Sequence, residues 1–147
     1  MALSLGVLAA ASFVSVAFSA NAPLIQRSLR LSHTEVGAIA SALYAGASVA
    51  SVAGGRLTDR VGPGPVLVVS MLVLAAGVVV AALSPIVGMF FAGVVGCGFG
   101  YGGVNPPTNV LANPRAVGRR GLAMSAKQSG IPLGGIVASA SLPRLAE

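Results

Sequence analysis

Charge is scarce in this sequence. Only nine of its 147 residues are basic and three are acidic, which together make 8% of the chain. In soluble domains about a quarter of the residues are charged. Hydrophobic residues account for 55% of the chain, and the mean hydropathy is +0.90. This composition excludes a soluble domain and predicts a protein that lies in a lipid bilayer.

Side chains that carry catalysis or bind metals are equally rare. The chain has one cysteine, Cys97, together with one histidine and three acids. A disulfide within the chain is excluded, and an ordinary metal site or a clear Cys/His catalytic pair cannot be assembled. No phosphate-binding P-loop pattern is present either. We therefore expect no enzyme activity, no metal and no cofactor.

The net charge of +6 could indicate a nucleic-acid-binding protein. The basic residues, however, are scattered singly or in pairs at the ends of apolar runs. Such a distribution is typical of charges that flank membrane spans, whereas a nucleic-acid interface needs a clustered basic patch. The expected surroundings are membrane lipid, and no nucleic-acid partner is expected.

The apolar runs predict an all-α polytopic membrane protein. A helix needs about 20 mostly apolar residues to cross the hydrocarbon core. Five stretches meet this length approximately, at residues 2–24, 34–54, 65–83, 86–111 and 121–142. A cleaved signal peptide is the alternative for the first stretch, because residues 20–22 read Ala-Asn-Ala. The length of this run and the lack of a basic residue before Arg27 argue against cleavage.

Small residues mark the second predicted span as a packing helix. Its start shows a capping box, with Ser32 as N-cap and Glu35 three residues later. Two stripes of small residues then recur at every fourth position, which lets a neighbouring helix approach closely in lipid. The stripes are Gly37, Ser41 and Ala45, and Gly46, Ala50 and Gly54.

The fourth predicted span is crowded with glycine and ends in polar residues and two prolines. GxxxG pairs occur at Gly96/Gly100 and Gly98/Gly102, and Asn105, Pro106, Pro107 and Asn109 follow. Prolines free backbone carbonyls, and polar groups at this depth need protein or water partners. Close packing with a kink and the wall of a solute cavity are both consistent with this pattern.

Lys127 is the only charged residue well inside a predicted span. One interpretation is that its long side chain extends back to the interface. The other is that Lys127 and the adjacent Gln128 face a cavity and hold an anionic group of a substrate, because charges inside membranes usually face a bundle interior or water. Further candidate cavity residues, each of which could instead bond a neighbouring helix, are Asn21, Tyr44, Tyr101, Asn105 and Asn109.

The charges between spans predict the orientation. Arg56, Arg60, Arg115, Arg119 and Arg120 lie on one side of the membrane in the five-span scheme, and Arg27, Arg30 and Arg144 lie on the other. Because basic residues are enriched on the cytoplasmic side, we expect the larger group and the N-terminus to be cytoplasmic.

A polar stretch at residues 55–62, with the sequence GRLTDRVG, is expected to form the turn between the second and third spans. It resembles the signature loop between helices two and three of the major facilitator superfamily, whose pattern is roughly G-x-L-A-D-R-x-G-R-K. The matching residues are Gly55, Leu57, Asp59, Arg60 and Gly62. The likeness ends there, since Pro63 and Gly64 stand where the family has two basic residues.

Two later segments extend the resemblance more loosely. Residues 96–98 are similar to the G-x-G run of the family's fourth helix, but Ala92 replaces an arginine that the family links to proton coupling, so that role is not carried over. In the fifth predicted span, Gly130, Pro132 and Gly134 resemble the glycine-proline motif of antiporter-type members.

The resemblance implies the first five helices of the N-terminal six-helix bundle of a transporter, without the sixth helix and the second half. Such a protein moves a small solute across the cytoplasmic membrane by alternating access, as a symporter or antiporter, with the substrate between the two halves. In the family, the acid matching Asp59 contacts a helix N-terminus of the second half. A pair with Arg56 or Arg60, or a solvated acid, is the alternative.

The sequence is also consistent with two other interpretations. The chain could be a small non-transporting membrane protein whose glycine-rich helices pack against a partner bundle or another copy. It could also be a fragment without activity of its own.

Overall fold

The computed structural model describes residues 6–7, 9–13, 16, 26, 31–112, 125, 128–129, 132 and 136. Three long helices lie within this part: α2 (His33–Val61), α3 (Pro63–Ala82) and α4 (Val87–Ala112). All three are long and apolar enough to cross a membrane. The first and fifth predicted spans lie largely outside the described residues, so the prediction of five spans is not confirmed.

The N-terminus of α2 carries the predicted capping box. The backbone N–H and the hydroxyl of Ser32 donate to Oε2 of Glu35 at 2.7 and 2.8 Å, and the Glu35 N–H donates back to Oγ of Ser32 at 3.3 Å. These bonds occupy polar groups that the first helical turn leaves without partners. The helix therefore has a well-defined start at His33.

The C-terminal end of α2 corrects the prediction of a polar turn. The sequence suggested that the helix stops near residue 54, but α2 continues through the charged residues to Val61. Its 29 residues span about 43 Å, more than the hydrocarbon core of about 30 Å. The charged residues can consequently leave the hydrocarbon without leaving the helix.

Gly62 is the single residue between α2 and α3. Its backbone has φ 86° and ψ 167°, a region that is essentially restricted to glycine. Its N–H donates to the carbonyl oxygen of Thr58 at 3.0 Å, and Pro63 begins α3. Proline is favourable at this first position because its φ is already helical and its missing N–H would have no helical partner.

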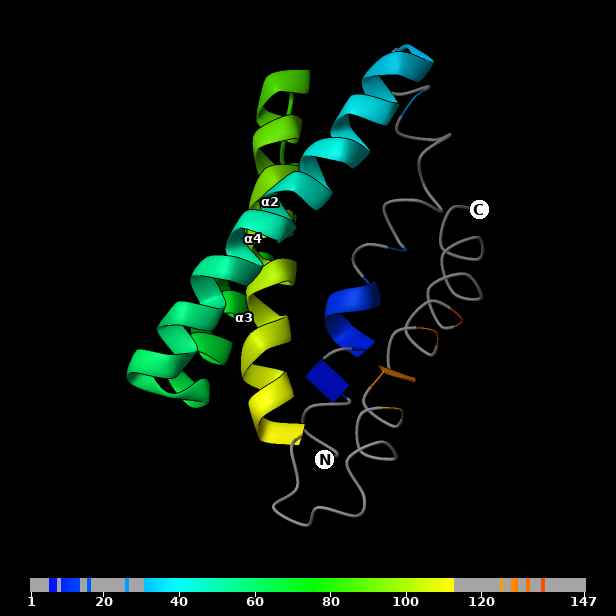
Figure 1. Ribbon diagram of the computed structural model, residues 1–147. Helices are drawn as coiled ribbons and strands as arrows, with labels where there is room; N and C mark the ends of the chain where they lie inside the picture. The colour runs from blue at the N-terminus through cyan, green and yellow to red at the C-terminus, as the bar shows by residue number, and fades with distance from the viewer. Residues whose placement is uncertain are drawn as a thin grey trace.

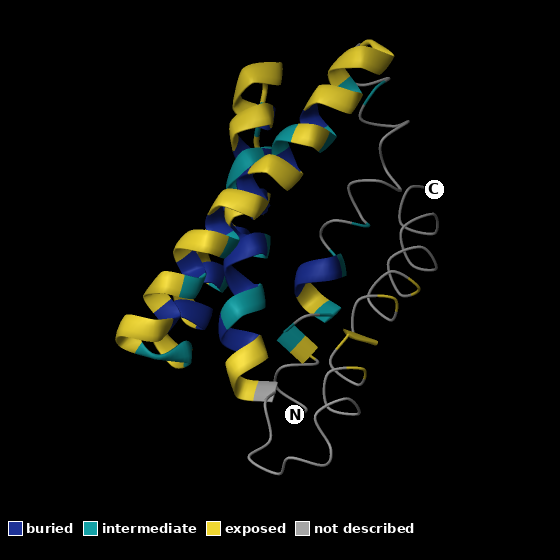
Figure 2. Cartoon of the chain, in the orientation of Figure 1, coloured by how far each residue is buried: buried dark blue, intermediate teal, exposed yellow. Residues whose placement is uncertain are grey.

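Helix α4 occupies the centre of the described bundle. Both α2 and α3 pack along it, whereas α2 and α3 barely touch each other. In Figure 1, α2 and α4 run down the view and α3 returns in the opposite direction. Figure 2 shows that buried residues gather where these helices meet α4, while the outward faces of α2 and α3 are exposed.

The interface between α2 and α4 is built from glycines that face carbonyl groups. A methyl group at Gly98 would overlap the carbonyl oxygen of Leu43, and one at Gly102 would overlap that of Ala47. The reverse arrangement also occurs. A Cβ at Gly46 would lie 3.2 Å from the carbonyl oxygen of Val95.

Gly54 also belongs to the interface between α2 and α4, since a Cβ there would lie 3.4 Å from the carbonyl oxygen of Gly103. Such spacings bring Cα–H groups against carbonyl oxygens, a weak attraction that recurs at helix–helix interfaces. Close backbone approach through glycine is the usual way that helices associate in lipid.

A second set of glycines brings α3 equally close to α4. A Cβ at Gly77 would meet the backbone nitrogen of Cys97 at 2.5 Å, and one at Gly93 would meet that of Ala81 at 2.5 Å. At Gly103 it would meet Oγ of Ser70 at 2.5 Å. Gly96 and Gly100, predicted as packing residues, lie on this side of α4 against Gly77 and Leu74.

The two stripes of small residues on α2 have different surroundings. Gly46, Ala50 and Gly54 are buried against α4. Gly37, Ser41 and Ala45 are exposed within the described part of the chain, and no atom lies within 4 Å of a Cβ built at Gly37. Only the second stripe is therefore a packing surface among the described helices.

Helix α4 continues through its two prolines. Pro106 and Pro107 lie inside the helix, and they cannot donate to the carbonyls of residues 102 and 103. One residue later, the fully buried Thr108 donates its hydroxyl to the carbonyl oxygens of Val104 and Asn105, at 2.8 and 2.9 Å. These bonds go to the two carbonyls that follow the pair freed by the prolines, so Thr108 adds hydrogen bonds to the helical turn next to the interruption.

Candidate functional site

The charged end of α2 is the first candidate region. Arg56, Asp59 and Arg60 are all exposed there. Thr58 points inward, is buried, and donates its hydroxyl to the carbonyl oxygen of Gly54 at 2.7 Å. Within the described residues, Asp59 has no ion pair with Arg56 or Arg60. The carboxylate is thus presented at the surface of the described bundle.

The two glycines of this region have different structural roles. Gly62 needs glycine for its backbone conformation, although the space around it is open. Gly55 is helical, has no positive φ, and has nothing within 4 Å of a Cβ built on it. Leu57 is 44% exposed and lines a groove described below.

A second candidate region lies on one face of α4. Tyr101 is half-buried and packs with Met71 of α3 and Val7 of the N-terminal segment against the cluster Ala11, Leu67, Leu74, Cys97 and Val104. Asn105 follows Tyr101 by one helical turn, so it lies on the same face, and it is also half-buried. This face of α4 therefore meets the N-terminal segment and combines an apolar floor with two polar side chains.

The remaining candidate residues are not brought together by the described structure. Gln128 and Pro132 are helical and exposed. Asn21, Lys127, Gly130 and Gly134 lie outside the described residues, as do the basic residues 115, 119 and 120. Tyr44, at 56% exposure, and Asn109 are exposed as well.

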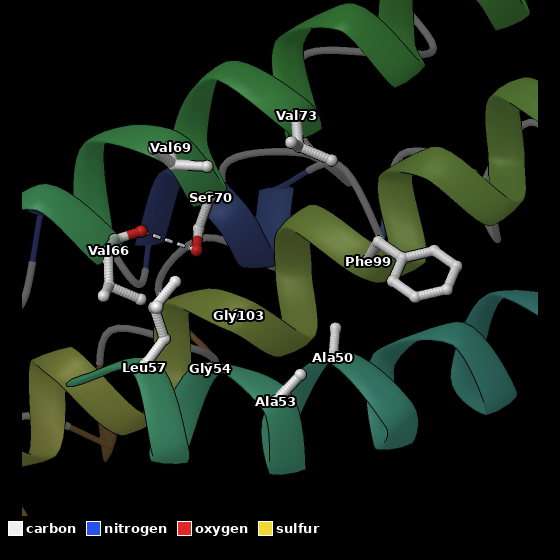
Figure 3. Close-up of a pocket in the computed structure, with 10 residues that line it drawn as sticks. All are labelled: Ala50, Ala53, Gly54, Leu57, Val66, Val69, Ser70, Val73, Phe99 and Gly103. Atoms are coloured by element: carbon white, nitrogen blue, oxygen red, sulfur yellow. Dashed lines mark hydrogen bonds between the residues drawn. The ribbon is translucent and has the colours of Figure 1, made fainter. Parts of the chain in front are cut away.

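A groove between α2 and α3 is a further feature that the sequence did not predict (Figure 3). It has a volume of about 300 Å³, and α4 forms its floor. Figure 3 shows the side chains of α2 and α3 facing each other across it. The lining residues are Ala50, Ala53, Gly54, Leu57, Val66, Val69, Ser70, Val73, Phe99 and Gly103.

No sequence pattern identifies this groove, because its lining combines residues from three helices, and most of them are small or aliphatic residues that are common throughout the chain. The glycines at the contacts of α2 and α3 with α4 can be recognised in the sequence by their regular spacing, but they indicate helix packing and not a groove. Within the described residues, no group of three or more His, Cys, Asp or Glu side chains could hold a metal ion.

Comparison with known proteins agrees with these features. The sequence profile of the Major Facilitator Superfamily matches residues 3–146. A gentisate transporter of Corynebacterium glutamicum is 32% identical over 111 residues, which are 74% of this chain and 25% of that protein. The chain thus spans about a quarter of the length of this curated relative. No solved structure matches the chain significantly.

Proposed function

Because this chain belongs to the Major Facilitator Superfamily, we propose that it is the N-terminal part of a longer transporter that moves a small solute by alternating access. The observation that carries the proposal is the family match, which covers nearly the whole chain. The family match and the three apolar helices together support a multi-pass membrane protein.

The solute in this proposal is an anionic small molecule. The relative is described as a transporter of gentisate, which is an aromatic carboxylate. Lys127 supplies a positive charge inside the fifth predicted span, and Gln128 follows it. A charge at this depth is best accommodated in a bundle interior or a water-filled cavity, where it can pair with a carboxylate.

The proposed solute path runs along the face of α4 that carries Tyr101 and Asn105. Both side chains are half-buried and lie on the side of the helix that meets the N-terminal segment. Asn21 lies in the first predicted span of that segment. An aromatic side chain and amides give a carboxylate-bearing ring both stacking and hydrogen-bonding partners.

The cytoplasmic charges of the proposal are those at the end of α2. Asp59 is exposed within the described bundle and is therefore accessible to a further part of the transporter. A contact there that forms in one conformation and breaks in the other fits alternating access. Movement of an anion in this way is coupled to protons or other ions, as symport or antiport across the cytoplasmic membrane.

Uptake of radiolabelled gentisate tests the proposal. A strain lacking the gene is complemented with the natural reading frame, unchanged or carrying Lys127→Met or Lys127→Arg. We expect uptake by the unchanged protein, loss with Lys127→Met, and partial recovery with Lys127→Arg, because the positive charge is kept. An uncharged sugar serves as the control solute.

The outcomes separate the parts of the proposal. Full uptake and affinity after Lys127→Met would refute the role of Lys127 but leave transport standing. Failure of the unchanged protein to take up gentisate and a panel of other carboxylates would refute the anionic substrate.

A second function is favoured by the exposed stripe Gly37, Ser41 and Ala45 of α2. Small residues at this spacing suit a partner helix, so the chain could act as a non-transporting membrane protein that packs against a partner or itself. The mass of the detergent-solubilised protein discriminates the two. A stable complex of two or more copies without uptake activity supports the second function.

A further inference from the structure

We infer that the groove between α2 and α3 binds one acyl chain of an anionic phospholipid, whose phosphate pairs with Arg56 and Arg60. This inference concerns a surface of the described helices, and it does not depend on the proposed transport.

The chemistry of the groove suits a hydrocarbon chain and not a polar solute. Nine of the ten lining residues have apolar side chains or none, and Ser70 is the exception. Its hydroxyl already donates to the carbonyl oxygen of Val66 at 2.8 Å, as Figure 3 shows. A polar solute would lose its hydration without gaining hydrogen bonds from these side chains. An acyl chain has no such cost.

The dimensions of the groove favour an acyl chain over a further helix. The lining extends over two turns of α2, from Ala50 to Leu57, and two turns of α3, from Val66 to Val73. Seven residues of helix rise about 10 Å, roughly a third of the hydrocarbon core. A crossing helix would need a longer seat, whereas about 300 Å³ lies in the usual range of small-ligand sites.

Charge is placed at the end of the groove where a headgroup would lie. Arg60 follows Ala53 by about two helical turns, so these residues share one face of α2. Arg56 lies one turn before Arg60 on the same side. Both arginines are exposed, and long arginine side chains reach along a helix toward the interface.

One negative charge lies near this arrangement. Asp59 is three positions after Arg56, so the two are neighbours on the surface of α2, but the two arginines outnumber this acid and leave the end of the helix with a net positive charge. The facing end of α3 begins with Pro63, Gly64 and Pro65, which carry no charge. Guanidinium groups bind phosphate with short, charge-assisted hydrogen bonds.

Native mass spectrometry of the purified protein in a nonionic detergent tests the inference. The protein is titrated with phosphatidylglycerol and with phosphatidylcholine of the same acyl chains. We expect tighter binding of phosphatidylglycerol, and a loss of about fivefold in its affinity for each arginine replaced in Arg56→Gln and Arg60→Gln. Binding of phosphatidylcholine should not respond to these replacements.

Filling the groove gives the matched comparison. Ala53→Phe should block the groove and weaken binding of both lipids, whereas Ala45→Phe, on an exposed part of α2 outside the groove, should not. Val69→Phe fills the groove from α3 and serves if Ala53→Phe fails to fold. Circular dichroism and size-exclusion chromatography show whether each variant keeps its helices.

Three results would overturn the inference. The first is equal lipid binding by the Ala45→Phe and groove-filling variants. The second is equal affinity for the two lipids that the arginine replacements leave unchanged. The third is a lipid-free dimer that the groove-filling variants dissociate, because a second copy would then occupy the groove.

Discussion

At the scale of single residues, glycine decides where this chain can turn and where its helices can touch. The charged stretch at residues 55–62 contains two glycines that look equivalent in the sequence. Gly62 has φ 86° and joins two helices, whereas Gly55 is an ordinary helical residue with open space around it. The backbone conformation, and not the amount of space, makes the first of them indispensable.

Gly62→Ala should lower the free energy of unfolding by about 1–3 kcal/mol, because an L side chain is strained in this backbone region. Gly55→Ala is the control, and it should be neutral or stabilising by about 0.5–1 kcal/mol, since alanine favours the helix. Thermal unfolding in detergent, followed by circular dichroism, measures both. Equal melting temperatures for the two variants would contradict the backbone assignment.

At the scale of helices, α4 is the element on which the described bundle is assembled. Its glycines fall on two sides, with Gly98 and Gly102 against carbonyls of α2, and Gly93, Gly100 and Gly103 against α3. Residues 98 and 100 are two positions apart and therefore lie on different sides of the helix. Glycine on both sides of α4 therefore lets two neighbouring helices pack this closely, whereas glycine on one side would allow only one.

Gly102→Ala should disrupt the packing of α2 on α4, because the added methyl group would overlap the carbonyl oxygen of Ala47. Both atoms belong to helical backbone, so neither can move away without shifting its helix. We expect a loss of stability of about 1–3 kcal/mol or more, as in other overpacked interiors. Gly88→Ala is the control on the same helix, since Gly88 is exposed with nothing within 4 Å. Fluorescence-detected size exclusion after heating compares them, and equal survival would refute the close contact.

At the scale of the whole molecule, the distribution of arginines predicts how the bundle is oriented. Arg56 and Arg60 lie at the end of α2 that is joined to α3, and the capping box with Ser32 and Glu35 lies at the other end. The joined end carries the positive charge, so we expect it to be cytoplasmic.

Reporter fusions test this orientation. Alkaline phosphatase, which is active only outside the cytoplasm, should be inactive when fused after Gly62 and active when fused after Leu83, at the opposite end of α3. A green fluorescent reporter, which fluoresces in the cytoplasm, should give the reciprocal pattern. An active phosphatase after Gly62 would reverse the predicted topology.

Several features of the fold and site could be predicted from the sequence because they depend on local chemistry. The lack of charge required a membrane, the pair Ser32 and Glu35 defined a helix start, and residues 55–62 identified the family, which the family match over residues 3–146 confirms. The shape of the charged stretch was predicted wrongly. A helix can carry charged residues beyond the hydrocarbon, so the charged stretch did not have to be a loop. Gly62 and Pro63 are the residues at which α2 ends and α3 begins.

The sequence by itself thus determined the membrane environment, the capped start of α2 and the family, since these follow from composition, from a cap and from a short motif. The tertiary structure decided which small residues pack. Gly46 and Gly54 are covered by α4 while Gly37 is exposed, although all three have the same spacing pattern. It also decided that α2 and α3 leave a groove between them above α4. The spacing of small residues determines which of them share a face of one helix. Whether a neighbouring helix covers that face depends on how the helices cross.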